Sequence, residues 1–177
     1  MSVFRSCFVP VIILLGLSPV LAQQAKPAEP DTQDVVYFLD SSDQTLKPLP
    51  KEPAKSASKV ETHGRSYSVK VAIQIPGSTS SFHVKGGNDL VFVVKCETFP
   101  AYQLLAFTNQ GGNREGLIAS SAAQAFGGVT DKKAFLLKFA VSRYGESSYR
   151  LEVKAPEAGE YGFVVGNYVY DFAVDPK

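Results

Sequence analysis

The stretch Tyr67-Ser-Val-Lys-Val-Ala-Ile-Gln-Ile75 carries the clearest structural signal in the chain. Its large apolar residues alternate with Ser, Lys, Ala and Gln, and this period of two is typical of a β-strand with one buried face. Pro76-Gly77 follows directly and is a turn signal that ends the strand. We therefore expect a half-buried strand over residues 67–75, with its Tyr, Val and Ile side chains facing a core.

Similar β-strand signals continue towards the C-terminus. Leu90–Cys96 is apolar on both faces, as in a central strand covered on each side. Residues 109–113 supply the Gly and Asn of a hairpin turn, and Gly166-Asn167 fits a two-residue type II′ link. No segment shows a sustained apolar face at helical spacing, and the best helical candidate, residues 119–126, is short. The pattern predicts an all-β fold of about eight main strands, a sandwich or a barrel.

The residues before Tyr67 divide into three segments of different composition. Residues 23–34 are polar and contain prolines, which predicts a disordered lead-in. Residues 35–50 hold two short apolar runs around Asp-Ser-Ser-Asp and predict an N-terminal β-hairpin, too small to be stable unless it packs on the body. Residues 51–66 are rich in Pro, Lys and Ser, and predict a linker or loop. The β-sandwich domain is expected over residues 67–177.

The segment Pro156-Glu-Ala-Gly-Glu-Tyr161 resembles the tyrosine corner of immunoglobulin-like sandwiches, in which the phenol bonds backwards to the main chain. The resemblance implies an immunoglobulin-like or fibronectin-type antiparallel β-sandwich, with Tyr161 as a structural residue. It also implies that the connection at residues 121–133 crosses from one sheet to the other. The immunoglobulin cysteine pair and tryptophan are missing, so the likeness is one of architecture. The alternative is an ordinary turn followed by a core tyrosine.

Short patches also resemble a loose group of uncharacterised exported bacterial proteins. They are Val36-Tyr-Phe-Leu-Asp40 with Leu46-Lys-Pro-Leu49, and Tyr144-Gly-Glu-Ser-Ser-Tyr149 before Gly159-Glu-Tyr161. The patches are unspecific and the group has no established activity, so no site residue follows from them.

Residues 1–22 have the features of a cleaved signal peptide. Arg5 precedes the apolar stretch Phe8–Leu17, and Val20-Leu21-Ala22 offers a small-residue cleavage site. The apolar stretch is about half of the roughly 20 residues that a membrane-spanning helix needs. Cys7 precedes this stretch and does not follow the cleavage site, so a lipid anchor is not expected. We expect a secreted or periplasmic protein without a transmembrane segment after cleavage; an uncleaved N-terminal anchor is the alternative.

The composition of the remaining 155 residues limits the possible partners. Arg5 is the only charged residue of the leader, so Lys+Arg falls from 18 to 17 and equals Asp+Glu, and no basic stripe for nucleic acid remains. Cys96 is the one cysteine left, and we expect a buried small hydrophobe, with a reactive or intermolecular thiol as the alternative. The absence of an Asn-x-Ser/Thr acceptor favours a bacterial envelope or periplasm.

No motif in the sequence predicts a catalytic, metal or cofactor site. His63 and His83 lack further ligands at metal-binding spacing. Residues 145–148 come nearest to the Gly-x-Ser-x-Gly motif of serine hydrolases but lie in an expected turn, and Asp40 and Asp43 suit a turn better than a calcium site. A sugar-binding platform is not expected either, because Trp is absent and five of the eight tyrosines are in phase with core residues: Tyr67, Tyr149, Tyr161, Tyr168 and Tyr170.

These observations favour a non-enzymatic interaction or structural module of the bacterial cell envelope, with an envelope protein or glycan as its partner. The turns at 97–101, 143–147 and 166–167 should cluster at one end, where Arg143 and Tyr144 are the candidate partner contacts. The alternatives are a small secreted hydrolase whose residues meet only in the fold, and a carrier of a small apolar ligand. We expect a monomer, or a dimer that exchanges the N-terminal hairpin.

Overall fold

A computed structural model describes residues 28–99, 101–124 and 128–177, with residues 63, 124 and 128–131 described by their backbone only. The predicted signal peptide and residues 23–27 lie outside the described residues. Within them every regular element is a β-strand, and apart from the parallel pair β6–β14 the named strands pair antiparallel. The all-β prediction is therefore confirmed for this part of the chain.

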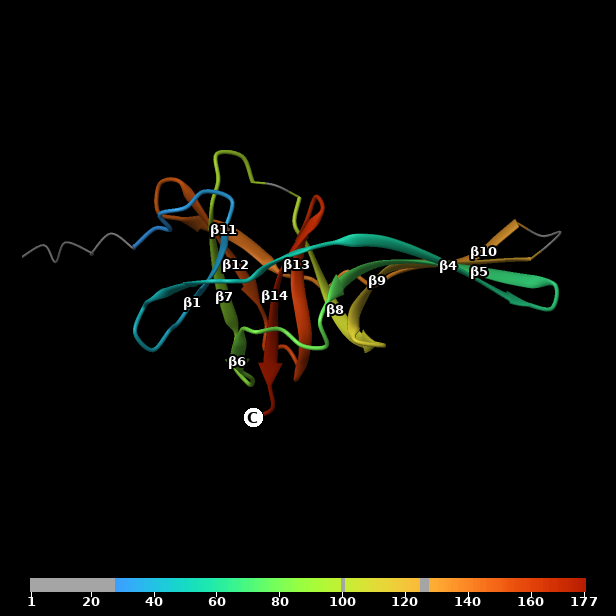
Figure 1. Ribbon diagram of the computed structural model, residues 1–177. Coiled ribbons are helices and arrows are strands. Elements are labelled where there is room, and N and C mark those ends of the chain that lie inside the picture. Colours follow the sequence, from blue (N-terminus) through green and yellow to red (C-terminus); the bar gives the residue numbers. More distant parts are fainter. Residues whose placement is uncertain (1–27, 100, 125–127) are drawn as a thin grey trace, which may run out of the picture.

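A five-stranded sheet forms one layer of the body (Figure 1). Its central strand is β7, the strand that the sequence predicted to be covered on both faces. Three consecutive residues of β7, Phe92, Val93 and Val94, are fully buried. The predicted N-terminal hairpin is present and packs beside this central strand. The strand order is β11–β12–β7–β1–β2, with bounds Ala140–Tyr144, Ser148–Val153, Leu90–Lys95, Val36–Leu39 and Leu46–Pro48.

The second sheet is larger and curls around the opposite side of the core (Figure 1). Its main path is β3–β14–β13–β8–β9–β5–β4, while β6 pairs with β14 and β10 pairs with β9. Tight turns connect its neighbours: Gly111 and Gly112 both have positive φ between β8 and β9, and Gly166 has φ +58° between β13 and β14. The bounds, in chain order, are Lys51–Pro53 (β3), Lys55–His63 (β4), Ser66–Pro76 (β5), His83–Lys85 (β6), Gln103–Gln110 (β8), Asn113–Gln124 (β9), Gly128–Ala134 (β10), Gly159–Val165 (β13) and Tyr168–Asp175 (β14).

Aromatic side chains from both sheets meet in the core. The Phe92 ring of β7 lies 5.0 Å from Phe163 of β13 and 4.8 Å from Phe172 of β14, between ring centroids. Such pairs contribute about 0.5–1.5 kcal/mol each beyond the area they bury. Tyr161 stacks on Phe172, and its hydroxyl donates to the carbonyl of Glu157 at 3.0 Å, which is the backward bond expected of a tyrosine corner.

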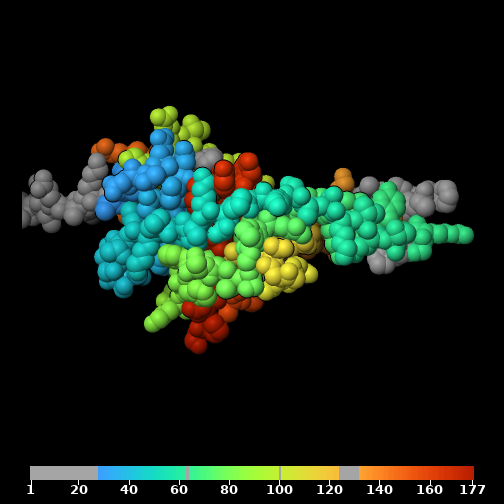
Figure 2. All heavy atoms as spheres, in the orientation of Figure 1, coloured from blue at the N-terminus to red at the C-terminus, as the bar shows by residue number. Residues whose placement is uncertain are grey.

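Four strands extend beyond the body as an arm, which we define as β4, β5, β9 and β10 (Figure 1). The space-filling view shows the arm projecting from one side of the molecule (Figure 2). Ile73 and Ile75 of β5 are buried at its root, whereas Tyr67, farther along the same face, is 42% exposed. The prediction that Tyr67 faces a core is therefore wrong: the alternation continues along the strand, but no second layer covers it there. Tyr168, also expected in the core, is 42% exposed at the end of β14.

The linker or loop expected at residues 51–66 is instead mostly strand. β3 pairs with β14, and β4 pairs with β5 along nine consecutive residues. β4 is an edge strand whose Lys, Ser and Ala side chains are largely solvated, so its sequence lacks the apolar alternation that marks a half-buried strand. Its register is set by the two-residue link Gly64-Arg65, where Gly64 has φ +62°.

One further expectation about a connecting segment is wrong. The connection at 121–133, expected to cross from one sheet to the other, falls largely in β9 and β10, which pair with each other in the arm. Because Ala and Ser favour neither a buried strand face nor a clear turn, this segment carries little strand signal. The last part of the predicted disordered lead-in is also ordered, since Asp34 donates from its backbone N to the carbonyl of Lys95 and accepts from the Tyr170 hydroxyl at 2.6 Å.

Candidate interaction surfaces

The three turns predicted to cluster lie at the same end of the body, the upper end in Figure 1. The backbone N of Cys96 donates to the carbonyl of Ser147 at 3.2 Å, and the ring centroids of Phe99 and Tyr149 lie 5.1 Å apart. These contacts join the turn after β7 to the turn between β11 and β12. The β13–β14 turn is joined to β3 by a bond from Ala54 N to the carbonyl of Asn167.

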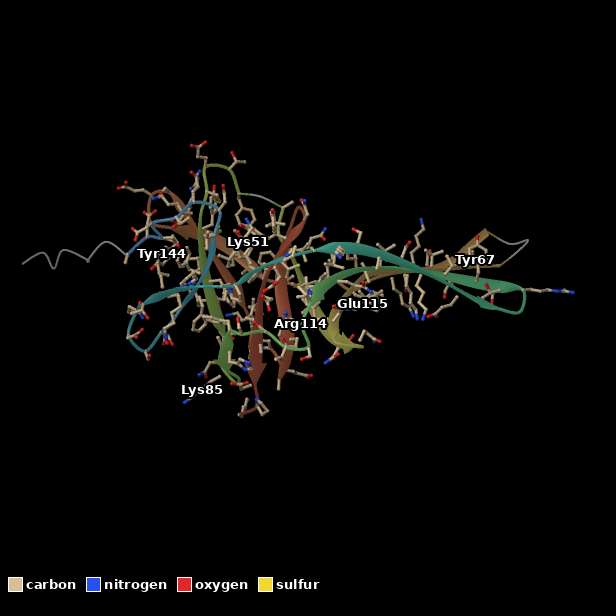
Figure 3. The ribbon with its side chains drawn as sticks, viewed as in Figure 1. Lys51, Tyr67, Lys85, Arg114, Glu115 and Tyr144 are labelled. Atoms are coloured by element: carbon tan, nitrogen blue, oxygen red, sulfur yellow. The ribbon has the colours of Figure 1, made fainter. Side chains whose placement is uncertain are left out.

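The two candidate contact residues at this end have different surroundings. The Arg143 guanidinium carbon lies 4.3 Å from the ring centroid of Tyr149, which is a cation–π geometry within the chain. Tyr144 is half-buried at the end of β11 (Figure 3). The Arg143 side chain is exposed, but its guanidinium already contacts Tyr149 on the neighbouring strand β12.

The turn beside these residues is occupied by a carboxylate of the same chain, that of Glu29. It accepts hydrogen bonds from the backbone N of Glu146 at 2.6 Å and of Ser147 at 3.1 Å. The hydroxyls of Ser147 and Ser148 donate to it at 2.5 and 2.8 Å. The bond from the Ser147 hydroxyl contributes most to lowering the pKa of Glu29 to about 2. The lead-in therefore covers part of the surface that sequence analysis assigned to a partner.

A cavity of about 510 Å³ opens between the β1–β2 hairpin and β6. Phe38 and Phe82 line it, with their ring centroids 5.9 Å apart. At its rim Lys47 Nζ pairs with Asp40 Oδ2 at 2.7 Å, and this bond is the main cause that lowers the pKa of Asp40. His83 and Asp89 also line the cavity, so its wall combines aromatic rings with charged groups and can accept a small molecule that has apolar and polar parts.

Asp40, Asp43 and Cys96, which were considered for metal or thiol chemistry, have structural roles, whereas the side chain of His63 lies outside the described part of the chain. Asp40 accepts from Ser42 and Asp43 accepts from Thr45, as the turn interpretation predicted. Cys96 is buried, as expected, and burial raises the pKa of its thiol. Over the described ranges, no cluster of three or more His, Cys, Asp or Glu side chains could hold a metal ion. The same ranges contain no helix with the length and apolarity needed to cross a bilayer.

A buried ionic cluster that sequence analysis did not identify lies at the root of the arm (Figure 3). Arg114 of β9 has a side chain only 3% exposed, and its Nη1 lies 2.5 Å from Asp171 Oδ2 and 3.1 Å from Glu160 Oε2. Glu160 also accepts from the backbone N of Ser80 and the Thr79 hydroxyl. The available signal was Asp171, an acidic residue between apolar neighbours in β14. Nothing in the sequence around Arg114 marked Arg114 as the partner of Asp171.

The arm has one apolar face and one polar face. Three large side chains on the apolar face are exposed: Val60 (64%), Tyr67 (42%) and Val71 (38%). A shallow groove of about 290 Å³ lies on this face beside Val69 and Ala119. On the polar face Glu61 pairs with Lys70 at 2.9 Å and with Lys59 at 3.1 Å, and these contacts lower the pKa of Glu61. The arm is thus an amphipathic sheet whose apolar face continues the core face of β5 into solvent.

No protein-family model, no curated protein and no solved structure matched the chain in comparisons with them. The two antiparallel sheets are compatible with a β-sandwich, and no match identifies a particular sandwich family. The function of the protein is therefore inferred from the surfaces described above.

Proposed function

We propose that this protein is an exported, non-enzymatic interaction module of the bacterial cell envelope, and that the apolar face of the arm contacts an envelope protein. The observation that carries the proposal is the row Val60 of β4 with Tyr67 and Val71 of β5. These side chains are exposed although they lie on the same face of the sheet as the buried Ile73 and Ile75. A contiguous apolar patch framed by polar residues is the usual mark of a protein interaction site.

A protein partner fits this surface better than a glycan or a nucleic acid. The row is aliphatic apart from Tyr67, and stacking of sugar rings requires flat aromatic platforms. The chain as a whole carries a formal net charge of only +1, which gives little attraction for nucleic acid. Export is inferred from residues 1–22. The tyrosine corner supports an immunoglobulin-like body of two sheets, to which the arm is an addition.

A second candidate function, a carrier of a small apolar ligand, is favoured by the cavity beside Phe38 and Phe82. Its volume of about 510 Å³ lies within the usual range for small-molecule sites. The hydrolase alternative has less support. His83, at the same cavity, pairs with Asp175 at 2.8 Å, and this bond raises its pKa, but its Nε2 faces the carbonyl of Ser80 and not a nucleophilic hydroxyl.

Two tyrosine variants with equal starting exposure test the proposed contact. The mature chain is used to recover partners from solubilised envelopes of its source cell, beside the variants Tyr67→Ser on the arm and Tyr168→Ser on the body. Both tyrosines are 42% exposed, so the variants remove similar apolar area at different places. We expect one envelope protein at reproducible stoichiometry with the wild type and Tyr168→Ser, and at least about tenfold less with Tyr67→Ser, as for a central interface residue. Equal recovery by both variants, or no recovery by a folded wild type, would contradict the proposal.

A further inference from the structure

The strand β4 forms an open edge of the arm. It is the last strand of its sheet in the described part of the chain, and it runs for nine residues, Lys55–His63. His63 and Ser66 flank a two-residue turn and therefore bond to each other, and bonded pairs alternate along an antiparallel ladder. The odd-numbered residues of β4 thus bond to β5. The even-numbered ones, including Val60, direct their backbone N–H and C=O groups to the open side.

The two edges of the arm differ in how they are protected against pairing. Proteins commonly block an open edge with charged side chains, most effectively when a charge lies on the apolar face. β10 has such a charge, because Lys132 pairs with Ser121 on that face. β4 carries its charges on the polar face only, and its apolar face holds the uncharged residues Ser56, Ser58, Val60 and Thr62. β4 is therefore the edge on which a further strand can pair.

We propose that the strand that pairs there is β4 of a second copy of this chain, antiparallel, with Val60 opposite Val60 on the two-fold axis. This register places Lys59 of each copy opposite Glu61 of the other, twice over. Lys59 and Glu61 are odd-numbered, so they form the non-hydrogen-bonded pairs, in which side chains approach most closely. Opposite charges at such positions stabilise a sheet, and like charges destabilise it.

The neighbouring registers are less favourable. One step of the ladder corresponds to sliding the second β4 strand by two residues. A one-step shift in one direction sets Lys59 against Lys59, and a one-step shift in the other direction sets Glu61 against Glu61. A two-step shift pairs Lys55 with Glu61, but it leaves Val60 opposite Ser56. Only the register centred on Val60 matches the charges and also covers the most exposed large apolar side chain of the arm, which is 64% exposed.

The pairing would join two arms into one continuous sheet, from β10 of one copy to β10 of the other. Both apolar faces then lie on the same side, because a two-fold axis perpendicular to the sheet relates the copies. The proposal uses the same arm as the proposed envelope contact and shares Val60 with it, but it depends on the backbone edge of β4 and not on Tyr67 or Val71. A dimer would thus present a doubled apolar face to the envelope partner.

Charge-reversed variants test this register directly. The oligomeric state of the exported chain is measured by sedimentation velocity over a range of concentrations. Lys59→Glu and Glu61→Lys each turn two attractive pairs into repulsive ones, and should raise the dimer dissociation constant about tenfold or more. An equimolar mixture of the two variants should recover the dimer, because every cross-strand pair is then Glu against Lys. The variant carrying both changes in one chain should also dimerise.

Lys55→Glu is the matched control, since it reverses a charge on the same face of the same strand but outside the paired stretch. It should dimerise like the wild type; if Lys55→Glu and Glu61→Lys weakened the dimer and Lys59→Glu did not, the shifted register would be correct and the proposed one wrong. A spin label at Val60→Cys should give the shortest label-to-label distance of any β4 position, which checks the register without charge changes. A wild type that stays monomeric at all concentrations overturns the proposal. That outcome leaves the loss of the envelope partner by Tyr67→Ser as a separate result.

Discussion

At the scale of single residues, Arg114 links the arm to the body. Its guanidinium is buried and contacts the carboxylates of Asp171 and Glu160, so a single positive charge forms ion pairs with two negative charges. Arg114 Nε and Asp171 Oδ1 are buried without a hydrogen-bond partner. A buried cluster of this kind adds little to stability compared with apolar side chains, but the loss of one member leaves an uncompensated charge inside the protein.

Replacement of Arg114 by Met is therefore expected to lower the free energy of unfolding by about 3–5 kcal/mol. Met fills most of the space, so the loss comes from Asp171, which remains buried without its cation. The measurement is urea denaturation of the variant and of Arg65→Met, a control at the exposed tip of the arm. The control should change the unfolding free energy by no more than about 0.5 kcal/mol. Equal stability of the two variants would show that the cluster does not hold the arm root.

Residue-level predictions from the sequence succeeded where burial follows from the strand pattern. Cys96 is buried at the end of the central strand, and Tyr161 makes the backward bond. They failed for Tyr67, because periodicity reports which face a side chain is on and not whether another layer covers that face. Arg114 was missed for a related reason: its partners Asp171 and Glu160 are 57 and 46 residues away in the chain.

At the scale of elements, the lead-in is held by an anion-binding turn between β11 and β12. Four donors from Glu146, Ser147 and Ser148 converge on the Glu29 carboxylate. Consecutive backbone N–H groups of a turn form a concave site that favours an anion. The lead-in is further held by the bond from Tyr170 to Asp34. The described part of the lead-in, residues 28–34, is thus docked although its polar composition predicted disorder.

The docking of the lead-in should depend on pH. The pKa of Glu29 is lowered from 4.5 to about 2 in the folded chain, so the carboxylate stabilises the docked state fully above pH 4.5, and this stabilisation is lost as pH falls towards 2. Glu29→Gln should release the lead-in already at neutral pH and remove this part of the pH dependence. Limited proteolysis of the lead-in at pH 7 and NMR titration of the Glu29 carboxyl are the measurements. A carboxyl that titrates near pH 4.5 would contradict the docked geometry.

The elements that the sequence predicted are those with a strong local signal. β5 and β7 have clear apolar patterns, and the hairpins β8–β9 and β13–β14 contain the glycines that their turns require. β4 and the distal part of β9 have no such signal. Their strand character comes from pairing with β5, which lies between them, so it is a property of the assembled sheet and not of either segment.

At the scale of the whole molecule, the two-layer core covers only the part of the large sheet nearest the body. Phe92, Phe163 and Phe172 fill the space between the layers, and Ile73 and Ile75 mark where the core ends along β5. Among the described residues neither core cluster includes Tyr67, Val69 or Val71. A layered all-β body could be predicted from the sequence, but the length of β5 that extends beyond it could not, because that length depends on where the opposite sheet stops.

Because the core covers the body strands but not the distal part of the arm, the body and the arm should differ in local stability. Amides of β7 and β13 should exchange with deuterium only through global unfolding, at an opening free energy of about 5–15 kcal/mol, as in ordinary domains. Amides in the distal part of β4 and β10 are protected by backbone bonds with little buried apolar area beneath them, and should exchange roughly a hundredfold faster or more in dilute solution. Hydrogen exchange read by mass spectrometry at two protein concentrations makes both comparisons. A higher concentration should slow exchange in β4 and leave β10 unchanged if copies pair through β4, because only the open groups of that strand then gain partners. Exchange in β4 as slow as in β7 in dilute solution would mean that the arm is stable by itself and needs no partner.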